Sequence, residues 1–473
     1  MSRMNRSNPL DARAWAPSVP EGDAPYYLRL AGAVQAAIRD GVLPEGARLP
    51  PQRELAARLR VSVATATAAY DELELRGVVR RHVGRGTFVA SPQRPARGGA
   101  GVIDLSSNEP PVQAIAPAMR DLLRALIDDV DTADLLRYPS ARDAERYAQA
   151  AAQWVARTCT GMAGHAARLV PCQGATQGLL AVLRLHGAHS PVVLCEPVTY
   201  PGYKVAAQVL GLRLVPVSCD DEGIAPDALA DRAGRLKPAA VVVCPALHNP
   251  TGATLSLARR HALVDVARRC GLTIVEDDPF SPLLAERERI PAIASLAPEL
   301  TYYVGSASKT IAPGFRAGWV VPPPDRRHDL AAAVQAMTAA AAPFGCPIST
   351  AGATPFGFLA FAKLCETRAA DTLLAQVRAE VAARYALARR VIGPWLAEVP
   401  LGTPLQAWVP LDAERSERLH GALIGQGIRV TSPATPVIAG PARGVRICLG
   451  AARRREQLDE ALHVVRGELE RAA

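Results

Sequence analysis

Residues 306–319 read SASKTIAPGFRAGW and carry Lys309, one of only four lysines among the 54 basic side chains of this 473-residue chain. A short apolar segment, 302–304, comes shortly before this stretch. Similar segments lie upstream at 192–195, 212–217, 241–244 and 272–275. Mostly helical spacing separates them. This alternation predicts an α/β domain built on a mainly parallel sheet, with functional groups at the strand ends.

Four other short motifs precede residues 306–319 in a fixed order. Residues 174–177 (GATQ) begin a predicted helix whose backbone N–H groups could hold a phosphate. Three more motifs each follow a predicted strand: EPVTYPG at 196–202, HNPTG at 248–252 and EDDPF at 276–280. Each is weak alone, since an isolated NPTG is usually a turn. Together the five motifs resemble the fold-type I pyridoxal-phosphate (PLP) enzymes, the aspartate aminotransferase group, from about residue 103 to the C-terminus.

This resemblance implies most of the cofactor contacts. PLP carries an aldehyde that a lysine must hold as an imine, and Lys309 is the one lysine inside the motif set. In so lysine-poor a chain, its place inside the motif set favours a cofactor role over a surface role. By resemblance, Asp277 pairs with the pyridine nitrogen and keeps it protonated, so that the ring withdraws electrons. Asn249 donates to the phenolic oxygen of the ring, and Tyr200 stacks on the ring face.

The same resemblance places the phosphate group at the helix start formed by Gly174, Ala175 and Thr176. Ser306 and Arg316 are expected to close around it. A phosphate dianion needs fixed donors together with a permanent cation, and the planar guanidinium of arginine suits this task. We therefore expect the phosphate site at the start of this helix.

A further arginine is expected to bind the substrate rather than the cofactor. Arg446, in VRICLG at 445–450, falls where the family holds the α-carboxylate of its substrate. The alternative is a surface arginine on a C-terminal strand. The family builds its sites at a dimer interface. The resemblance therefore implies a homodimer, in which Tyr138 reaches the phosphate of the partner's site.

Two positions depart from the family pattern. The family usually has a tyrosine three residues after the cofactor aspartate, whose hydroxyl also bonds the phenolic oxygen, but Phe280 stands there. Loss of that donor is expected to change the pKa of the Lys309 imine and to weaken control of the chemistry. Residues 140–144 (SARDA) also lack the glycine that the family has after Tyr138 and Pro139. Both departures suggest that PLP binds but that fast transamination is not the task of this site.

The first ninety residues predict three short helices followed by a hairpin. The helices are expected at 25–40, 52–60 and 62–76, and the strands of the hairpin at 78–82 and 87–89. Ser62 is expected to cap the third helix. This order describes a winged helix-turn-helix, in which the third helix lies in the DNA major groove. The charge agrees, because residues 1–97 hold fifteen arginines against nine acidic residues, about two-thirds of the net charge of +9.

Three segments of this region strongly resemble the GntR family of transcription regulators: GARLPPQRELAARL (46–59), VSVATATAAY (61–70) and GRGTFV (84–89). The resemblance implies that double-stranded operator DNA is contacted by Arg48, Arg53, Ser62, Thr65, Thr67, Gly84 and Arg85. The third helix also presents Ala64 and Ala68, and such small side chains offer few hydrogen bonds to bases. We therefore expect the arginines to supply most contacts and a dimer to supply the specificity. The alternative is that these arginines form an ordinary solvated face.

The domain order narrows the function. The expected parts are a winged-helix domain (1–89), a linker (90–101) and a PLP domain (102–473) with a large part at about 150–345 and a smaller C-terminal α+β part at about 346–473. This order resembles the short-linker branch of the MocR subfamily of GntR regulators. The implied function is a transcription regulator whose DNA binding is modulated by an amino-compound effector that reacts with or binds at the Lys309–PLP aldimine. Two alternatives stay open. One is an active aminotransferase that carries a DNA-binding module, and the other is a DNA-binding protein whose large domain only dimerises.

Composition indicates the setting of this function. The nine cysteines have no two-residue spacing typical of zinc or redox sites, so we expect no metal. They are interpreted as small buried side chains in a reducing cytoplasm. The N-terminus has no apolar signal core. Residues 330–362 are uncharged, but prolines and glycines interrupt them, which favours a buried interface segment over a membrane span. We expect a cytoplasmic protein, associated with the nucleoid when it is bound to DNA, and no membrane contact.

Overall fold

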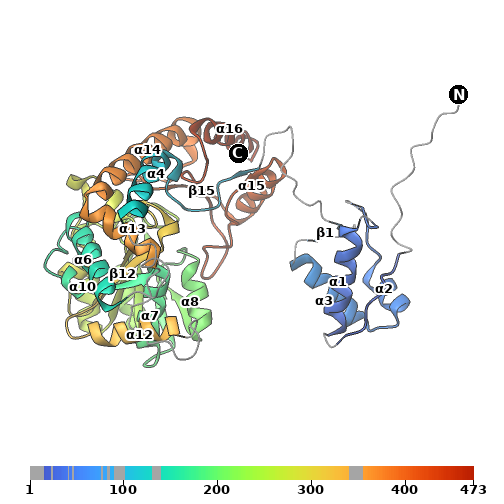
Figure 1. The fold of residues 1–473 in the computed structure, drawn as a ribbon, viewed down its shortest axis with the longest axis horizontal. Coiled ribbons are helices and arrows are strands. Elements are labelled where there is room, and N and C mark those ends of the chain that lie inside the picture. The colour runs from blue at the N-terminus through green and yellow to red at the C-terminus, as the bar shows by residue number, and fades with distance from the viewer. Residues whose placement is uncertain are drawn as a thin grey trace. The chain divides into compact units, whose positions relative to one another are not determined.

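The computed structural model describes residues 15–22, 25–40, 42–44, 47–75, 78–82, 86–89, 102–129, 140–339 and 355–472. The chain forms two compact units, residues 1–101 and 102–473 (Figure 1). Three candidate site residues, Gly84, Arg85 and Tyr138, lie outside the described residues.

The N-terminal unit consists of three helices and a hairpin. Its elements are α1 (Tyr26–Arg39), α2 (Gln52–Leu59), α3 (Val63–Leu75), β1 (Val79–His82) and β2 (Gly86–Val89). The two strands are antiparallel, with Val79 opposite Val89. The predicted winged helix-turn-helix is confirmed.

Apolar side chains at helical spacing form the core of this unit. Ala69, Tyr70 and Leu73 of α3 are at most 1% exposed and pack in one cluster with Leu30 of α1. The hydroxyl of Tyr70 donates to the carbonyl of Pro50 over 2.6 Å, so the phenol keeps a hydrogen-bond partner inside the core. At the start of α3, Ser62 Oγ accepts the N–H of Thr65, which is the expected N-cap bond.

A seven-stranded sheet forms the centre of the C-terminal unit. Its spatial order is β4 (Val170–Gln173), β12 (Ala317–Val321), β11 (Thr301–Ser306), β10 (Thr273–Asp277), β9 (Ala240–Val243), β5 (Val192–Cys195) and β6 (Arg213–Pro216). Strand β12 is antiparallel to both of its neighbours, and the other pairs are parallel. The predicted α/β fold with a mainly parallel sheet is confirmed.

Helices cover both faces of this sheet, which explains why its inner strands are apolar throughout. The first face is covered by α7 (Ala175–Gly187), α8 (Gly202–Leu210) and α12 (Arg327–Ala339), and the second by α9 (Pro226–Leu236) and α10 (Leu257–Cys270). On β9, Val242 packs in the first core and Val241 and Val243 pack in the second, as the two-residue period of a strand requires. The sequence did not predict β4, because this edge strand contains Pro171.

The smaller part of this unit contains α14 (Ala369–Ile392), α15 (Ala413–Gly425) and α16 (Arg455–Ala472), which lie together at one end (Figure 1). Beside them, β13 (Gln406–Val409) pairs antiparallel with β15 (Val445–Cys448). The smaller part is not purely C-terminal. Strand β3 (Ile103–Asp104) pairs in parallel with β14 (Ile428–Arg429), so the first residues after the predicted linker join its core.

The C-terminal unit also contains the helices α4 (Val112–Asp129), α6 (Ala141–Thr158) and α13 (Pro355–Glu366). Residues 340–354 of the long uncharged segment lie outside the described residues. Among the described residues, no helix is both long and apolar enough to cross a membrane.

The interpretation of the cysteines as buried is wrong for Cys219 and Cys270, which are exposed. Both stand at the end of an element, where a strand begins or a helix stops.

Candidate functional site

A cavity of about 120 Å³ lies where the inner parallel strands end. Eight of the residues expected to bind the cofactor line it: Ala175, Thr176, Tyr200, Asn249, Asp277, Ser306, Lys309 and Arg316. They come from segments far apart in the chain, which the parallel strands bring to one edge of the sheet. Their contacts with a cofactor stay a prediction.

The expected phosphate end of the cavity is a tight turn before α7. Gly174 has a φ of 78°, a left-handed conformation that favours glycine, and Arg316 Nη2 donates to the carbonyl of Gln173 over 3.1 Å. A Cβ atom on Gly318 would lie 2.3 Å from the carbonyl carbon of Gly174, so β12 can approach this turn only with glycine there. The turn, the helix start and the guanidinium of Arg316 together form a cradle for an anion.

Asp277, the last residue of β10, presents one free carboxylate oxygen in the cavity. The hydroxyl of Tyr203 donates to Asp277 Oδ2 over 2.7 Å. The other oxygen, Oδ1, is buried and has no hydrogen-bond partner among the described residues. Burial raises the pKa of Asp277 to about 6, although the bond from Tyr203 opposes this rise. A cationic N–H group beside Oδ1 would satisfy it and stabilise its negative charge.

Lys309 follows β11 and is the one lysine among the described residues that line the cavity. Its Nζ donates to the carbonyl of Asn108. Burial lowers the pKa of Lys309, which favours the neutral amine that can attack an aldehyde. Asn108 is itself held by Gln406, whose Oε1 accepts its amide N–H over 3.1 Å.

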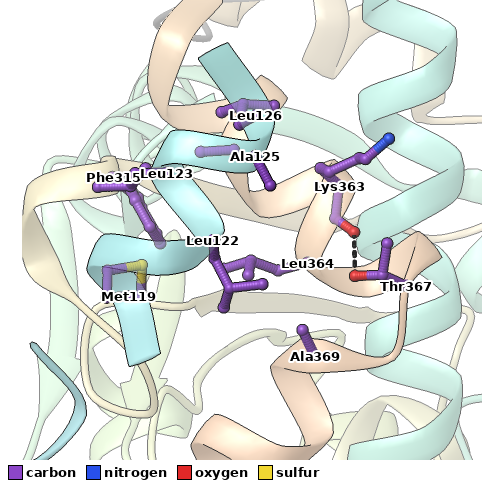
Figure 2. A pocket seen from close by; sticks show the side chains of 11 residues that line it. Met119, Leu122, Leu123, Ala125, Leu126, Phe315, Lys363, Leu364, Thr367 and Ala369 are labelled. Carbon is purple, nitrogen blue, oxygen red and sulfur yellow. Dashed lines mark hydrogen bonds between the residues drawn. The ribbon is translucent and has the colours of Figure 1, made fainter. Parts of the chain in front are cut away.

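Another lysine, Lys363, lies beside a separate cavity and is engaged elsewhere. This apolar cavity of about 280 Å³ is lined mainly by α4 and α13 (Figure 2). Figure 2 shows the ammonium of Lys363 pointing away from the apolar side chains, and it forms an ion pair with Asp129. Lys204 instead donates to two backbone carbonyls, of Ala434 and Val437. Neither lysine lines the cofactor cavity, whereas Lys309 does, which makes Lys309 the candidate for the imine.

Arg446 lies on β15 and is only 7% exposed, so it is not a surface arginine. Its Nη1 donates to Asn249 Oδ1 over 2.8 Å, and its Nη2 donates to Thr431 Oγ1 over 2.7 Å. Its Nε is buried and has no partner in the part of the chain that the structure describes. Arg446 does not line the cavity itself, but it reaches the cavity through Asn249. That it binds a carboxylate stays a prediction.

Phe280 lines the same cavity and is 3% exposed. A phenyl ring therefore stands where the family usually has a hydroxyl. It excludes water from this wall of the cavity but cannot donate a hydrogen bond to the cofactor.

The candidate DNA contacts lie around the start of α3. Arg53 and Ser62 are exposed, whereas Arg48, Thr65 and Thr67 are partly buried. Thr67 Oγ1 donates to Gln52 Oε1 over 3.1 Å, which ties α3 to the first turn of α2, where Arg53 lies. Arg48 forms a backbone bridge to Phe88 of β2. Their contacts with DNA stay a prediction.

Sequence reasoning missed several residues that hold the expected ones. Tyr203 fixes Asp277, and it stands in the first turn of α8, three residues after Tyr200. A second aromatic residue at this helical spacing was the available signal. Thr431 and the backbone of Asn108 gave no signal, because their partners Arg446 and Lys309 come from other parts of the chain.

Comparison with known proteins connects both units to families. Residues 100–465 match the family model described as aminotransferase class I and II, and residues 26–89 match that of bacterial regulatory proteins, gntR family. The chain is 24% identical over 469 residues to the uncharacterized HTH-type transcriptional regulator YdeF of Bacillus subtilis, covering 96% of both chains. It is 26% identical over 315 residues to the HTH-type pyridoxine biosynthesis transcriptional regulator PdxR of Corynebacterium glutamicum, covering 64% of this chain and 67% of PdxR.

Solved structures show the same fold for the C-terminal unit. An archaeal alanine:glyoxylate aminotransferase superposes with a TM-score of 0.67 at 17% identity, over 79% of this chain and 92% of that one. LysN, an α-aminoadipate aminotransferase of Thermus thermophilus complexed with N-(5'-phosphopyridoxyl)-L-leucine, superposes with a TM-score of 0.62 at 21% identity, over 85% of this chain and 98% of LysN.

Family and fold imply PLP as the cofactor, and the cavity fits its three functional groups. Asp277 Oδ1 lacks a partner among the described residues and suits the ring nitrogen. The turn at Gly174 with Arg316 suits the phosphate, and Lys309 suits the aldehyde. The chain belongs to the aminotransferase class I and II family and, through its gntR-type N-terminal domain, to the MocR subfamily of GntR transcription regulators.

Proposed function

We propose that this protein is a PLP-binding transcription regulator whose affinity for operator DNA changes when a small amino compound binds at the Lys309 site. The observation that supports this most is the PLP-type cavity with Phe280 in its wall, joined to a DNA-binding domain in one chain. The cavity retains the groups expected to bind the cofactor, but Phe280 lacks the hydroxyl that would help to control protonation during transamination.

When bound, PLP supplies an aldehyde that condenses with amines and a ring that withdraws electrons. Lys309 Nζ provides the amine that attaches it. Asp277 Oδ1 would accept a hydrogen bond from the protonated ring nitrogen, because an ionised carboxylate in a buried site is stabilised by an adjacent cation. Arg316 and the N–H groups of Ala175 and Thr176 bind the phosphate.

The effector in this proposal is an amino compound that also carries a carboxylate. Arg446 lies on β15 of the smaller part, and its partner Asn249 follows β9 of the larger part. A carboxylate bound by the buried guanidinium of Arg446 would be held from both parts at once. Binding would then favour one arrangement of the two parts over another. Through this change of arrangement, binding of the effector would alter the DNA affinity of the N-terminal unit.

An active aminotransferase is the second candidate. The bond between Arg446 and Asn249 favours it, since this pair would also hold the carboxylate of a substrate. Phe280 weighs against it, because the missing hydroxyl lowers control over protonation at the cofactor. We therefore expect weak or no physiological transamination.

GntR-type regulators bind operator DNA, and the exposed side chains of Arg53 and Ser62 support α2 and α3 as the surface that does so. A homodimer would pair two such surfaces. The apolar cavity along α4 and the exposed side chain of Ile127 on that helix support a contact between copies there. A regulator of this kind would act in the cytoplasm and bind the nucleoid through its operator.

The test is an absorption spectrum of the purified protein, taken with and without Lys309→Ala and then with a panel of amino acids. We expect a visible band that the variant loses, and one amino acid that shifts the band to a stable new position. Bleaching of the band that a keto acid reverses would instead support the aminotransferase. No band after addition of PLP would refute the cofactor proposal.

A further inference from the structure

A third and larger cavity, of about 630 Å³, lies between the larger and smaller parts of the C-terminal unit. We call it the acidic groove, because five of its lining residues are acidic: Glu196, Asp220, Asp221, Glu222 and Glu398. No lysine or arginine is among the described residues that line it. The loop around β7 (Cys219–Asp220) and β8 (Gly223–Ile224) forms one side, and the segment before β13 forms the other.

The negative charge of this groove is only partly compensated from outside. Arg259 forms ion pairs with Asp220 over 2.8 Å and with Glu222 over 3.1 Å. Asp221 and Glu398 are both exposed and both line the groove. Because Asp221 belongs to the larger part and Glu398 to the smaller part, an organic dication could contact both.

A buried histidine also points to a ligand in the groove. His248 lines it and is 6% exposed. Its Nδ1 interacts with Thr251 Oγ1 over 2.8 Å, but its Nε2 has no hydrogen-bond partner in the described part of the chain. Burial lowers the pKa of His248 to about 4, so the imidazole is neutral at pH 7 and does not repel a cation. A neutral imidazole can accept a hydrogen bond from an ammonium group.

The size and chemistry of the groove favour an organic cation over a metal ion. No three His, Cys, Asp or Glu side chains among the described residues stand close enough to hold a metal ion. The indole of Trp408 adds an aromatic surface to the lining, which suits an alkylammonium group. A volume of this order is typical of small-molecule sites.

We propose that the acidic groove is a second ligand site, which binds a small organic cation carrying two ammonium groups. It goes beyond the proposed function and does not depend on it. Cys244 lines both the acidic groove and the cofactor cavity, so the two sites are neighbours that share one wall. A dication bound between Asp221 and Glu398 stabilises the arrangement of the two parts in which the groove has this width.

The test uses a ligand that cannot react with the cofactor. N,N,N',N'-tetramethyl-1,4-diaminobutane carries two charged tertiary amines, and these form no imine with an aldehyde. Its binding to the full-length, PLP-saturated protein is measured by titration calorimetry. The affected variant is Asp221→Asn with Glu398→Gln. The matched control is Asp128→Asn with Glu417→Gln, which removes the same charge from α4 and α15.

We expect saturable binding that the groove variant weakens about tenfold, since each partly solvated ion pair contributes a modest amount. The control variant should bind as the wild type does, and the visible spectrum should not change during the titration. Absence of saturable binding up to about 10 mM would overturn the proposal. Equal loss in the control variant would overturn it too, as would a spectral change that follows binding, because the ligand would then occupy the cofactor cavity. Thermal unfolding of each variant, together with Glu398→Gln alone, separates lost binding from lost folding.

Discussion

Replacing Asp277 by Asn should stabilise the cofactor-free protein and at the same time weaken its binding of PLP. The carboxyl is 7% exposed, and one of its oxygens has no partner among the described residues. Burial raises its pKa from 3.8 to about 6. Without a cation beside it, the ionised carboxylate is therefore a destabilising group in the folded state. Asn keeps an oxygen to accept the hydroxyl of Tyr203 but carries no charge.

The magnitude follows from the difference between the two pKa values. One pKa unit corresponds to about 1.4 kcal/mol, so the ionised form costs about 3 kcal/mol of unfolding free energy at about pH 8. Because the folded-state pKa is raised, this cost appears as the pH rises from about 4 and is complete above about 6. The gain from Asp277→Asn should therefore be about half as large at about pH 5.

Urea unfolding of the cofactor-free protein at the two pH values measures this gain. PLP titration of the same variant should show an affinity lower by about a hundredfold or more, because breaking a buried ion pair costs about 3–5 kcal/mol and about 1.4 kcal/mol corresponds to a factor of ten. A variant that is less stable than the wild type at pH 8, or whose gain does not shrink at pH 5, would refute the reasoning. A variant that binds PLP as tightly as the wild type would refute the assignment of Asp277 to the ring nitrogen.

Three further substitutions test other parts of the site. Tyr203→Phe removes the donor to Asp277 Oδ2 and should weaken PLP binding roughly tenfold or more, measured by PLP titration; unchanged affinity would mean that Tyr203 does not position the carboxylate. Phe280→Tyr restores a hydroxyl in the cavity wall and should lower the pKa of the Lys309 imine by roughly one unit, measured as the pH midpoint of the visible absorption change. An unchanged or higher midpoint would contradict the role given to the missing hydroxyl. Arg53→Ala should weaken DNA binding about tenfold and reduce the slope of log affinity against log salt concentration by about one, measured by fluorescence anisotropy at several salt concentrations. An unchanged slope would show that Arg53 does not contact a DNA phosphate.

The sequence predicted the parts of the fold and site that depend on local pattern. Lys309, Asp277 and Asn249 each lie at or just after the end of a short apolar strand, and parallel strands bring such residues to one edge of a sheet. The third helix of the N-terminal unit was also predicted, and its Ala69 and Leu73, four residues apart, are buried on one face as a helix requires.

Features that depend on contacts between distant segments could not be predicted in this way. The pairing of β3 with β14 joins short segments with no periodicity of their own. Arg446 and Asn249 are 197 residues apart, and only the fold brings them within hydrogen-bond distance. The acidic groove likewise combines Asp221 and Glu398, each of which reads alone as an ordinary exposed charge.

The central claim is that an amino compound at Lys309 controls DNA binding. Its most direct test is the dissociation constant for DNA, measured by anisotropy on duplexes that the protein selects from a random pool. The PLP-saturated wild type and Lys309→Ala are compared across a panel of amino compounds. We predict that at least one compound shifts the wild-type constant by about fivefold or more and leaves that of the variant unchanged. No shift with any compound, or an equal shift in both proteins, would contradict the claim.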